Sequence, residues 1–275
     1  MSQTAPVEAP APASPPVEAA RTSAGVKATL AVLDLLAARS PLSLSEASRE
    51  LGIAKSTLHR VLAVLVERGW AVRDAEGGYD LGIRALRLGS RASSLPLVTA
   101  FRTIAAEFLT GHDETIALAV LDGDESLFLA FEETSQPVRL VTHIGSKTPA
   151  FASASGRVVL ASLPPPAVAA MFGGKLLVTP TGRRLNGVAE LQAILEEVRV
   201  QGYAENWEET AESLYTASVP VVNGEGVTLA ALTTLVPVSR ITPERRDTII
   251  ADLTTLGAKL SDHVSWLPSF SARRA

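Results

Sequence analysis

The stretch PLSLSEASRELGIAKSTLHR, residues 41–60, decides the fold of the first part of the chain. Ser43 and Glu46 have the spacing of a capping box, in which the serine hydroxyl accepts from the amide of Glu46 and the glutamate reaches back. This pattern predicts a helix that begins after Ser43 and runs to Leu51. Gly52 then supplies a tight turn of the kind that glycine permits.

The sequence on either side completes a small domain. Apolar residues at helical spacing predict a helix over 24–39 and another from about Lys55 to Arg68. Two short strand-like runs, 70–74 and 79–81, surround a glycine-rich turn and predict a hairpin. Three helices followed by a hairpin, in this order, indicate a winged helix-turn-helix domain.

The helix that begins near Lys55 has two different faces. Leu58, Val61, Leu62 and Leu65 fall on one side, whereas Ser56, Arg60 and Ala63 fall on the other. Small polar residues and one long donor suit a helix that enters the major groove, where arginine can bond guanine in two places. The candidate DNA-contacting residues are Ser43, Ser45, Lys55, Ser56, Thr57, His59 and Arg60, with Arg73 in the hairpin. The same face also fits a solvated surface or a protein-binding winged helix.

The charge of the chain changes along its length. Residues 21–95 carry 11 basic and 7 acidic side chains, whereas residues 96–275 carry 14 basic and 20 acidic ones. A basic head on an acidic body fits a DNA-binding module joined to one that does not bind DNA. Ordinary scatter of surface charge would give a similar asymmetry.

The two ends and the composition exclude several classes of protein. Residues 1–22 are rich in Pro and Ala and lack the features of a signal peptide, so we expect a disordered tail. No apolar run approaches the roughly 20 residues that span a bilayer. The chain has no cysteine, which excludes thiolate metal sites and a cysteine nucleophile. We expect a cytoplasmic protein with no membrane contact, no metal and no cofactor.

Strand and helix patterns interleave in the second part. The expected strands are 115–122, 126–132, 138–142, 214–222 and 227–236. The expected helices are 97–110, 156–162, 166–172, 188–201 and one that begins after Thr242. Because hairpins join several strands, the pattern predicts an α+β fold with a mainly antiparallel sheet.

Several motifs together resemble the IclR family of bacterial transcription regulators. The resemblance begins with residues 41–60, above all with Lys-Ser-Thr-x-His-Arg at 55–60. It continues through Glu67-Arg-Gly-Trp70, Gly78-Tyr-Asp-Leu-Gly82, Leu88-Gly89, Ile144-Gly-Ser-Lys-Thr-Pro149, Gly202-Tyr203-Ala204, Glu208-Glu209 and Val219-Pro-Val221. It covers about residues 23–265, which is all but the two ends.

The resemblance implies a domain organisation and partners. It implies a winged helix-turn-helix over 23–82, a linker helix over 83–95, and a GAF-like α/β effector and oligomerisation domain with a curved antiparallel sheet over 96–265, before a tail at 266–275. It further implies a homodimer or homotetramer on a pseudo-palindromic double-stranded DNA operator. The expected effector is a small organic acid, and family members act as repressors, activators or both.

The resemblance also places an effector pocket. Its expected lining is Leu140, Ala154, Ser155, Asn206, Leu214, Thr216, Thr233 and Leu235. Free amides at a helix start favour a carboxylate, and Ser153 could contribute a hydroxyl or simply cap the helix. For each apolar residue of the set, core packing is an equally good explanation.

Departures from the family pattern bear on the ligand. Many members have Asp where this chain has Asn206, and often Cys where it has Thr216. A strand that often reads Ser-x-Ser reads Thr233-Thr-Leu235 here. With Trp207 and Tyr215 nearby, we expect an aromatic or medium-sized carboxylate and a repressor of a catabolic operon.

Two other functions are to be weighed against a DNA-binding regulator. An enzyme would need a nucleophile elbow, a phosphate loop or metal-ligand spacing, and the sequence offers none. Its four histidines, His59, His112, His143 and His263, are scattered, so we expect no enzyme. The alternative is a winged-helix protein-interaction module with a ligand-free oligomerisation domain.

Overall fold

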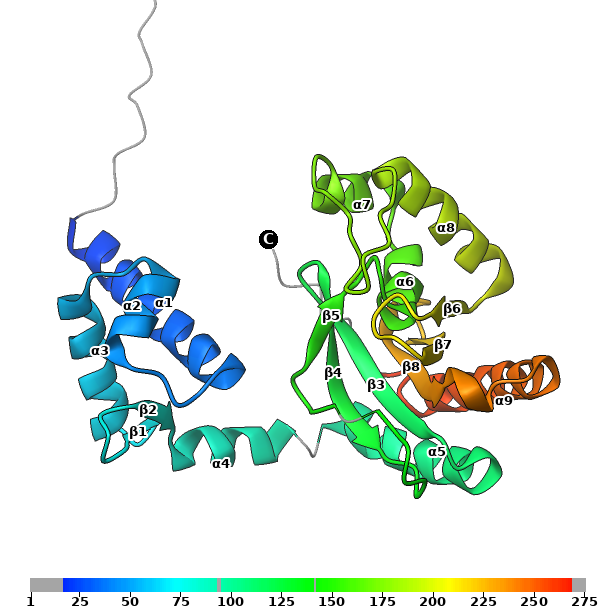
Figure 1. The fold of residues 1–275 in the computed structure, drawn as a ribbon, viewed down its shortest axis with the longest axis horizontal. Coiled ribbons are helices and arrows are strands. Elements are labelled where there is room, and N and C mark those ends of the chain that lie inside the picture. Colours follow the sequence, from blue (N-terminus) through cyan, green and yellow to red (C-terminus); the bar gives the residue numbers. More distant parts are fainter. Residues whose placement is uncertain (1–16, 93–94, 141, 269–275) are drawn as a thin grey trace, which may run out of the picture. The chain divides into compact units, whose positions relative to one another are not determined.

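The computed structural model describes residues 17–92, 95–140 and 142–268, and these divide into two compact units between Ala92 and Ser93 (Figure 1). Residues 1–16 and 269–275 of the expected tails, and residues 93–94 of the expected linker helix, lie outside the described residues. No helix in the described ranges is long and apolar enough to cross a membrane.

Both expected tails were predicted too long. The first helix begins at Val17, so residues 17–22 are helical rather than part of a tail. The run Glu-Ala-Ala-Arg at 18–21 consists of good helix formers, which explains the early start. At the other end, Leu267 is buried in the core of the second unit, and its carbonyl accepts from the Asn223 amide at 3.0 Å.

The first unit is a winged helix-turn-helix. Its elements are α1 (Val17–Ala38), α2 (Leu44–Leu51), α3 (Lys55–Glu67), β1 (Ala71–Arg73), β2 (Tyr79–Leu81) and α4 (Ile83–Ala92). The predicted capping box is confirmed: Ser43 Oγ accepts from the Glu46 amide at 3.2 Å, and Glu46 Oε2 accepts from the Ser43 amide at 2.9 Å. Gly52 ends α2 with φ 65°, as the turn requires.

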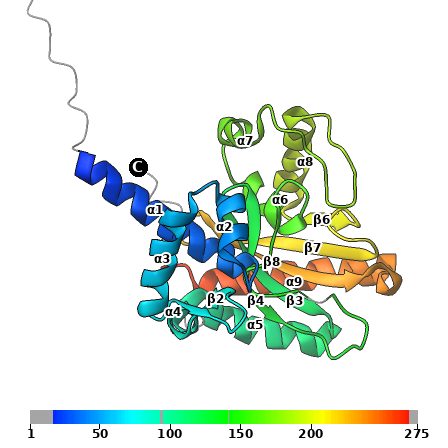
Figure 2. The same ribbon diagram turned by 60° about the vertical axis from the view of Figure 1, so that its left-hand side comes forward.

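The core of this unit lies between α1, α2 and α3, which pack together in Figure 2. Leu58, Leu62 and Leu65 of α3 are buried there, as their spacing predicts. The hairpin is tied to the start of α2 because the backbones of Leu42 and Tyr79 exchange hydrogen bonds of 2.9 and 2.8 Å. Helix α3 and the hairpin therefore share one core.

The second unit is an α+β domain built on a six-stranded antiparallel sheet in the order β5-β4-β3-β8-β7-β6. Its strands are β3 (Thr115–Asp122), β4 (Glu125–Glu132), β5 (Lys147–Pro149), β6 (Ala204–Trp207), β7 (Leu214–Val222) and β8 (Thr228–Pro237). Its helices are α5 (Pro96–His112), α6 (Ala154–Ala161), α7 (Pro165–Phe172), α8 (Val188–Gln201), the short 3-10 helix η1 (Val238–Arg240) and α9 (Pro243–His263). The predicted fold class is confirmed.

One expected strand was wrong and two others were missed. The described residues of the 138–142 segment form no strand, and residue 141 lies outside the described ranges. Arg240 Nη1 donates to the Val138 carbonyl at 2.8 Å, so a side chain satisfies the backbone there instead of a strand. The missed strands are β5 and β6, which are short and stand at the two edges of the sheet.

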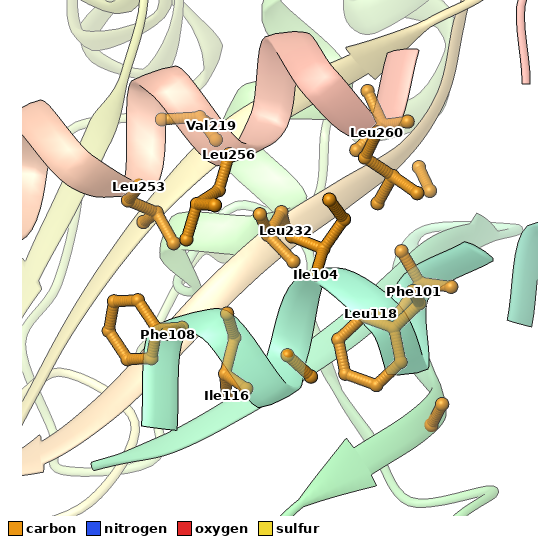
Figure 3. Close-up of a cluster of buried hydrophobic side chains, with 14 of the residues drawn as sticks. Phe101, Ile104, Phe108, Ile116, Leu118, Val219, Leu232, Leu253, Leu256 and Leu260 are labelled. Carbon is orange, nitrogen blue, oxygen red and sulfur yellow. The ribbon is translucent and has the colours of Figure 1, made fainter. Parts of the chain in front are cut away.

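Helices α5 and α9 cover one face of the sheet. Figure 3 shows Phe101, Ile104 and Phe108 of α5 facing Leu253, Leu256 and Leu260 of α9. Sheet residues Ile116, Leu118, Val219 and Leu232 complete this cluster. Gly257 allows the close approach of α9, because a Cβ there would lie 2.6 Å from Val219 Cγ2.

Helices α6, α7 and α8 gather on the opposite side of the sheet around a second cluster (Figure 1). Helix α6 is the innermost of the three, since every one of its residues is buried. Gly156 in its first turn makes this possible, because a Cβ there would lie 2.3 Å from both the Cα and the carbonyl oxygen of Ala150. The first turn of α6 therefore packs directly against the backbone of Ala150.

Asp113 anchors the segment that follows β4. It ends α5 with φ 47°, and its carboxylate accepts from the Ser135 amide at 2.9 Å, the Ser135 hydroxyl at 2.8 Å and the Gln136 amide at 2.8 Å. These hydrogen bonds, the Ser135 amide first, lower the pKa of Asp113 from 3.8 to about 2. The charged form is therefore the one that holds this segment in the folded protein.

Because folding lowers this pKa, the stabilisation is complete above pH 3.8 and is lost as the pH falls towards about 2. We expect Asp113→Asn to unfold at a lower urea concentration than the parent at neutral pH. Between pH 3.8 and about 2, the variant should lose less of its free energy of unfolding than the parent does. Urea unfolding across this range measures the difference. Asp262→Asn is the matched control, since the Asp262 carboxylate has no hydrogen-bond partner among the described residues. A parental pH dependence in Asp113→Asn would contradict the assignment.

Candidate functional site

The first candidate site is the outer face of α3. Lys55, Ser56, His59 and Arg60 are exposed on it, Thr57 is half-buried, and Ser45 is exposed on α2. No side chain in the described ranges forms a hydrogen bond or an ion pair with any of these six. The face predicted from helical spacing is thus a row of donors free to meet a ligand.

The start of α3 adds backbone donors to this face. Ala54, which precedes the helix, makes no side-chain cap, in contrast to Ser43 before α2. The first amides of a helix lack partners within the helix, and the helix dipole favours an anion beside them. A phosphate group is the anion that a DNA duplex offers at this place.

Two of the predicted DNA-contacting residues are placed differently. The Ser43 hydroxyl is engaged in the capping box, where it also donates to Glu46 Oε2 at 2.7 Å. Ser43 therefore acts as a helix cap rather than as a free donor. Arg73 is exposed on the wing, with its guanidinium 5.5 Å from the centre of the Tyr79 ring. This contact holds the wing arginine at the surface of the hairpin.

The second candidate site is a cavity of about 210 Å³ in the sheet domain. It lies between β4, β5, β7 and β8, the start of α6 and the segments around Leu140 and Thr210. Seven of the eight residues predicted for the pocket line it: Leu140, Ala154, Ser155, Leu214, Thr216, Thr233 and Leu235. The sequence did not identify Phe128, Thr142, Ser146, Lys147, Thr148, Thr210 and Ala211, which also line it.

Asn206 is the predicted pocket residue that does not line the cavity. Its side chain is buried, its amide donates to the Ala152 carbonyl, and its Oδ1 accepts from the Glu209 amide at 3.1 Å. Both of its polar atoms are used within the protein, so the prediction of a direct pocket contact was wrong. Asn206 instead ties the turn after β6 to the segment before α6.

The polar end of the cavity is a group of hydroxyls at the start of α6. Ser155 Oγ lies 2.8 Å from Ser126 Oγ, and Ser126 pairs with Thr148 across β4 and β5. Thr148 Oγ1 is buried and has no hydrogen-bond partner in the described part of the chain. Ser153 caps α6, since its hydroxyl accepts from the Gly156 amide at 3.1 Å, so the capping interpretation is confirmed.

The charged residue of the lining is paired with two carboxylates. Lys147 lines the cavity, and its ammonium lies 2.8 Å from Asp122 Oδ2 and 3.4 Å from Glu125 Oε2. The hydrogen bond to Asp122 raises the pKa of Lys147, so this group is charged at neutral pH. No group of three or more His, Asp or Glu side chains in the described ranges could hold a metal ion.

The other end of the cavity is apolar. Phe128, Leu214 and Leu235 pack there with the small side chains of Ala117 and Ala119, which leave room above the sheet. A cavity that combines an apolar end with several hydroxyls has the form of a small-molecule site. An unpaired buried hydroxyl costs free energy unless a partner reaches it, so Thr148 indicates where that partner would bind.

A winged helix-turn-helix whose α3 face has no side-chain partner among the described residues, on a chain that also carries a separate α+β domain, fits a helix-turn-helix transcription regulator. Residues 26–75 match the IclR helix-turn-helix domain, and residues 89–262 match the bacterial transcriptional regulator IclR C-terminal domain. The protein therefore belongs to the IclR family of bacterial transcription regulators.

Individual relatives agree with this assignment. The chain is 32% identical to the HTH-type transcriptional regulator BhcR of Paracoccus denitrificans, over 82% of this chain and 83% of the relative. The crystal structure of the IclR transcriptional regulator from Alicyclobacillus acidocaldarius superimposes with a TM-score of 0.78 at 25% identity, over 87% of this chain and 98% of that one. An IclR homologue from Microbacterium hydrocarbonoxydans, crystallised with 4-hydroxybenzoate, shares the fold with a TM-score of 0.70 at 22% identity, over 87% of this chain and 100% of that one.

Proposed function

We propose that this regulator binds its operator through α3 and that a small aromatic carboxylic acid in the cavity modulates that binding. The protein acts in the bacterial cytoplasm, represses a catabolic operon and does not turn its ligand over. The observation that carries the ligand assignment is the buried hydroxyl of Thr148, which has no hydrogen-bond partner among the described residues, in a cavity lined by both hydroxyl-bearing and apolar side chains.

The shape and polarity of the cavity support an aromatic acid. Its volume of about 210 Å³ is smaller than the roughly 300–1,000 Å³ of sites for drug-sized ligands, and a single ring with a carboxylate fits that scale. The carboxylate would lie at the start of α6, near Ser155 and Thr148. The ring would pack against Phe128 and Leu235. A relative of the same fold binds 4-hydroxybenzoate, which belongs to this class.

A ligand panel tests the assignment. Thermal unfolding of the full chain is followed with benzoate, 4-hydroxybenzoate, glyoxylate and pyruvate. A ligand at 100 times its dissociation constant adds roughly 2.7 kcal/mol to the folded state, which raises the midpoint visibly. We expect an aromatic acid to raise it at the lowest concentration. Tighter binding of glyoxylate or pyruvate would contradict the assignment, and a flat panel would favour a ligand-free oligomerisation domain.

Thr148→Val separates ligand binding from stability. Valine keeps the shape of threonine and removes a buried hydroxyl that has no partner among the described residues, so the unliganded variant should unfold at the parental temperature or above it. Its affinity for the aromatic acid should fall roughly tenfold, because a hydrogen bond to a charged group is lost. Titration calorimetry and thermal unfolding measure the two quantities.

The control for this substitution is Thr234→Val. Thr234 is also buried, but its hydroxyl donates to the Thr115 carbonyl at 3.0 Å and it does not line the cavity. This variant should lose stability and keep its affinity for the acid. If Thr148→Val lost stability and kept its affinity, its hydroxyl would have no part in ligand binding.

A second copy of the chain is the expected partner on DNA. Every described side chain of α4 except that of Ala85 is exposed, including Ile83, Leu86 and Leu88, and α1 exposes Val26 and Leu30. A helix of this length is marginal in water without tertiary packing. These apolar side chains support a homodimer through the first unit, which would read a pseudo-palindromic operator with two copies of α3.

A further inference from the structure

A buried cluster of charge lies next to the cavity without lining it. It consists of Arg157, Asn206 and Glu209, which are 4%, 1% and 7% exposed. None of the three is among the residues that line the cavity. Charged residues are almost never buried this fully unless they are paired, so the cluster needs a structural reason at this place.

Arg157 forms the centre of the cluster from within α6. Its Nη2 lies 2.5 Å from Glu209 Oε2 and its Nη1 lies 3.2 Å from Glu209 Oε1, which makes a two-point contact. Its Nε donates to the Phe151 carbonyl at 2.9 Å. One guanidinium therefore holds both the segment before α6 and the turn after β6.

Asn206 and Arg183 complete the cluster. The Asn206 side-chain amide donates to the Ala152 carbonyl, and its Oδ1 accepts from the Glu209 amide. Asn206 therefore connects the same two segments as Arg157, namely the segment before α6 and the turn after β6. Arg183 Nη1 donates to Glu209 Oε1 at 2.6 Å and brings in a third segment. All the polar atoms named here have partners, so the cluster is a closed network.

The two connected segments both lead into walls of the cavity. Ser153, Ala154 and Ser155 lie between the two attachment points of Arg157, which are Phe151 and its own position in α6. Thr210 and Ala211 follow Glu209 directly. We infer that Arg157, Asn206 and Glu209 are positioning residues, which set the spacing of these walls and so the shape of the effector site.

The energetics favour this role over a purely stabilising one. A buried ion pair adds little net stability, because desolvation of the two charges offsets their attraction, yet removing one partner leaves an uncompensated buried charge. What the pair supplies is a fixed geometry between two segments more than 50 residues apart, since Arg157 and Glu209 are separated by 52 positions. The inference rests on the proposed function only in that it treats this cavity as the effector site.

A thiol assay tests the positioning role without any ligand. The full chain has no cysteine, so Ala154→Cys places a single buried thiol in the cavity wall. Ala105→Cys places one in the core on the other face of the sheet. Each is labelled with methyl methanethiosulfonate, with and without Glu209→Gln. Labelling follows the population of the open form when opening is fast.

We expect Glu209→Gln to speed the labelling of Ala154→Cys roughly tenfold or more, as a local opening, and to leave Ala105→Cys near its parental rate. Glu114→Gln is the matched control. Glu114 is also buried and also contacts two arginines, Arg240 and Arg245, but touches neither wall that Arg157 connects. It should not speed the labelling of Ala154→Cys to the same extent.

Equal acceleration of both thiols by Glu209→Gln, or an equal effect of Glu114→Gln on Ala154→Cys, would overturn the positioning role. If Glu209→Gln fails to fold, the double variant Arg157→Met/Glu209→Leu removes both buried charges and takes its place, with the same outcomes expected. Failure of 4-hydroxybenzoate to bind the parent would count against the proposed ligand and would leave the thiol result intact.

Discussion

Gly156→Ala should lower the unfolding temperature of the sheet domain by roughly 6–12 °C, which corresponds to about 3 kcal/mol for a domain of this size. The new methyl group would lie 2.3 Å from the Cα and the carbonyl oxygen of Ala150, and backbone atoms cannot move aside as the end of a side chain can. The start of α6 would have to shift away, and with it Ser153, Ala154 and Ser155 of the cavity wall. The variant should therefore also lose its affinity for an aromatic acid.

Gly111→Ala provides the control. Gly111 lies in α5, where a Cβ would meet nothing within 4 Å, so alanine should stabilise by about 0.4–1 kcal/mol through the unfolded chain. Thermal unfolding followed by circular dichroism compares the two variants. Equal unfolding midpoints for Gly156→Ala and Gly111→Ala would show that the backbone around Ala150 can shift to accommodate the methyl group. The close packing of α6 would then contribute nothing to the stability of the domain.

Arg60→Ala should weaken binding to the cognate operator by about 1–3 kcal/mol, or roughly 5–150-fold, and relax the choice of base at one position of each half-site. Arg60 is exposed on α3, and no residue in the described part of the chain competes for its guanidinium. An arginine on a recognition helix can bond guanine O6 and N7 together. Operators selected from a random DNA pool supply the cognate sequence.

Two further variants separate base reading from charge. Lys55→Ala, at the start of α3, should weaken cognate and random DNA alike and reduce the salt slope by about 1, as loss of a phosphate contact does. Arg102→Ala removes the same charge from the second unit and should leave DNA binding unchanged. If Arg60→Ala lost the same factor on cognate and random DNA, Arg60 would contact the backbone rather than a base.

The features that sequence predicted well are those that depend on nearby residues. The capping box of Ser43 and Glu46 and the left-handed turn at Gly52 each involve a few consecutive positions, and α2 ends where they require. The buried stripe of α3 likewise follows from helical spacing alone. The sequence was misleading at Val138, where a β-branched run resembles a strand but a distant arginine bonds its carbonyl.

The candidate cavity depends on contacts that local patterns do not contain. Thr148 reaches it only because β5 pairs with β4 and places Thr148 opposite Ser126, and β5 is too short to show strand alternation. Asn206 matched a pocket position of the family, yet its two polar atoms are engaged by Ala152 and Glu209. The family resemblance therefore predicted which segments lie at the cavity. The structure was needed to show which side chains of those segments line it.

Occupancy of the cavity should change the affinity of the protein for DNA. The most direct test is fluorescence anisotropy of a selected operator with the full chain, in the presence and absence of the aromatic acid that most raises its unfolding temperature. A coupling free energy of about 1–3 kcal/mol is typical, so we predict a roughly 5–150-fold change in the operator dissociation constant, and a shift of the ligand response to higher concentration in Thr148→Val. An operator affinity that stays the same at saturating ligand would contradict the account.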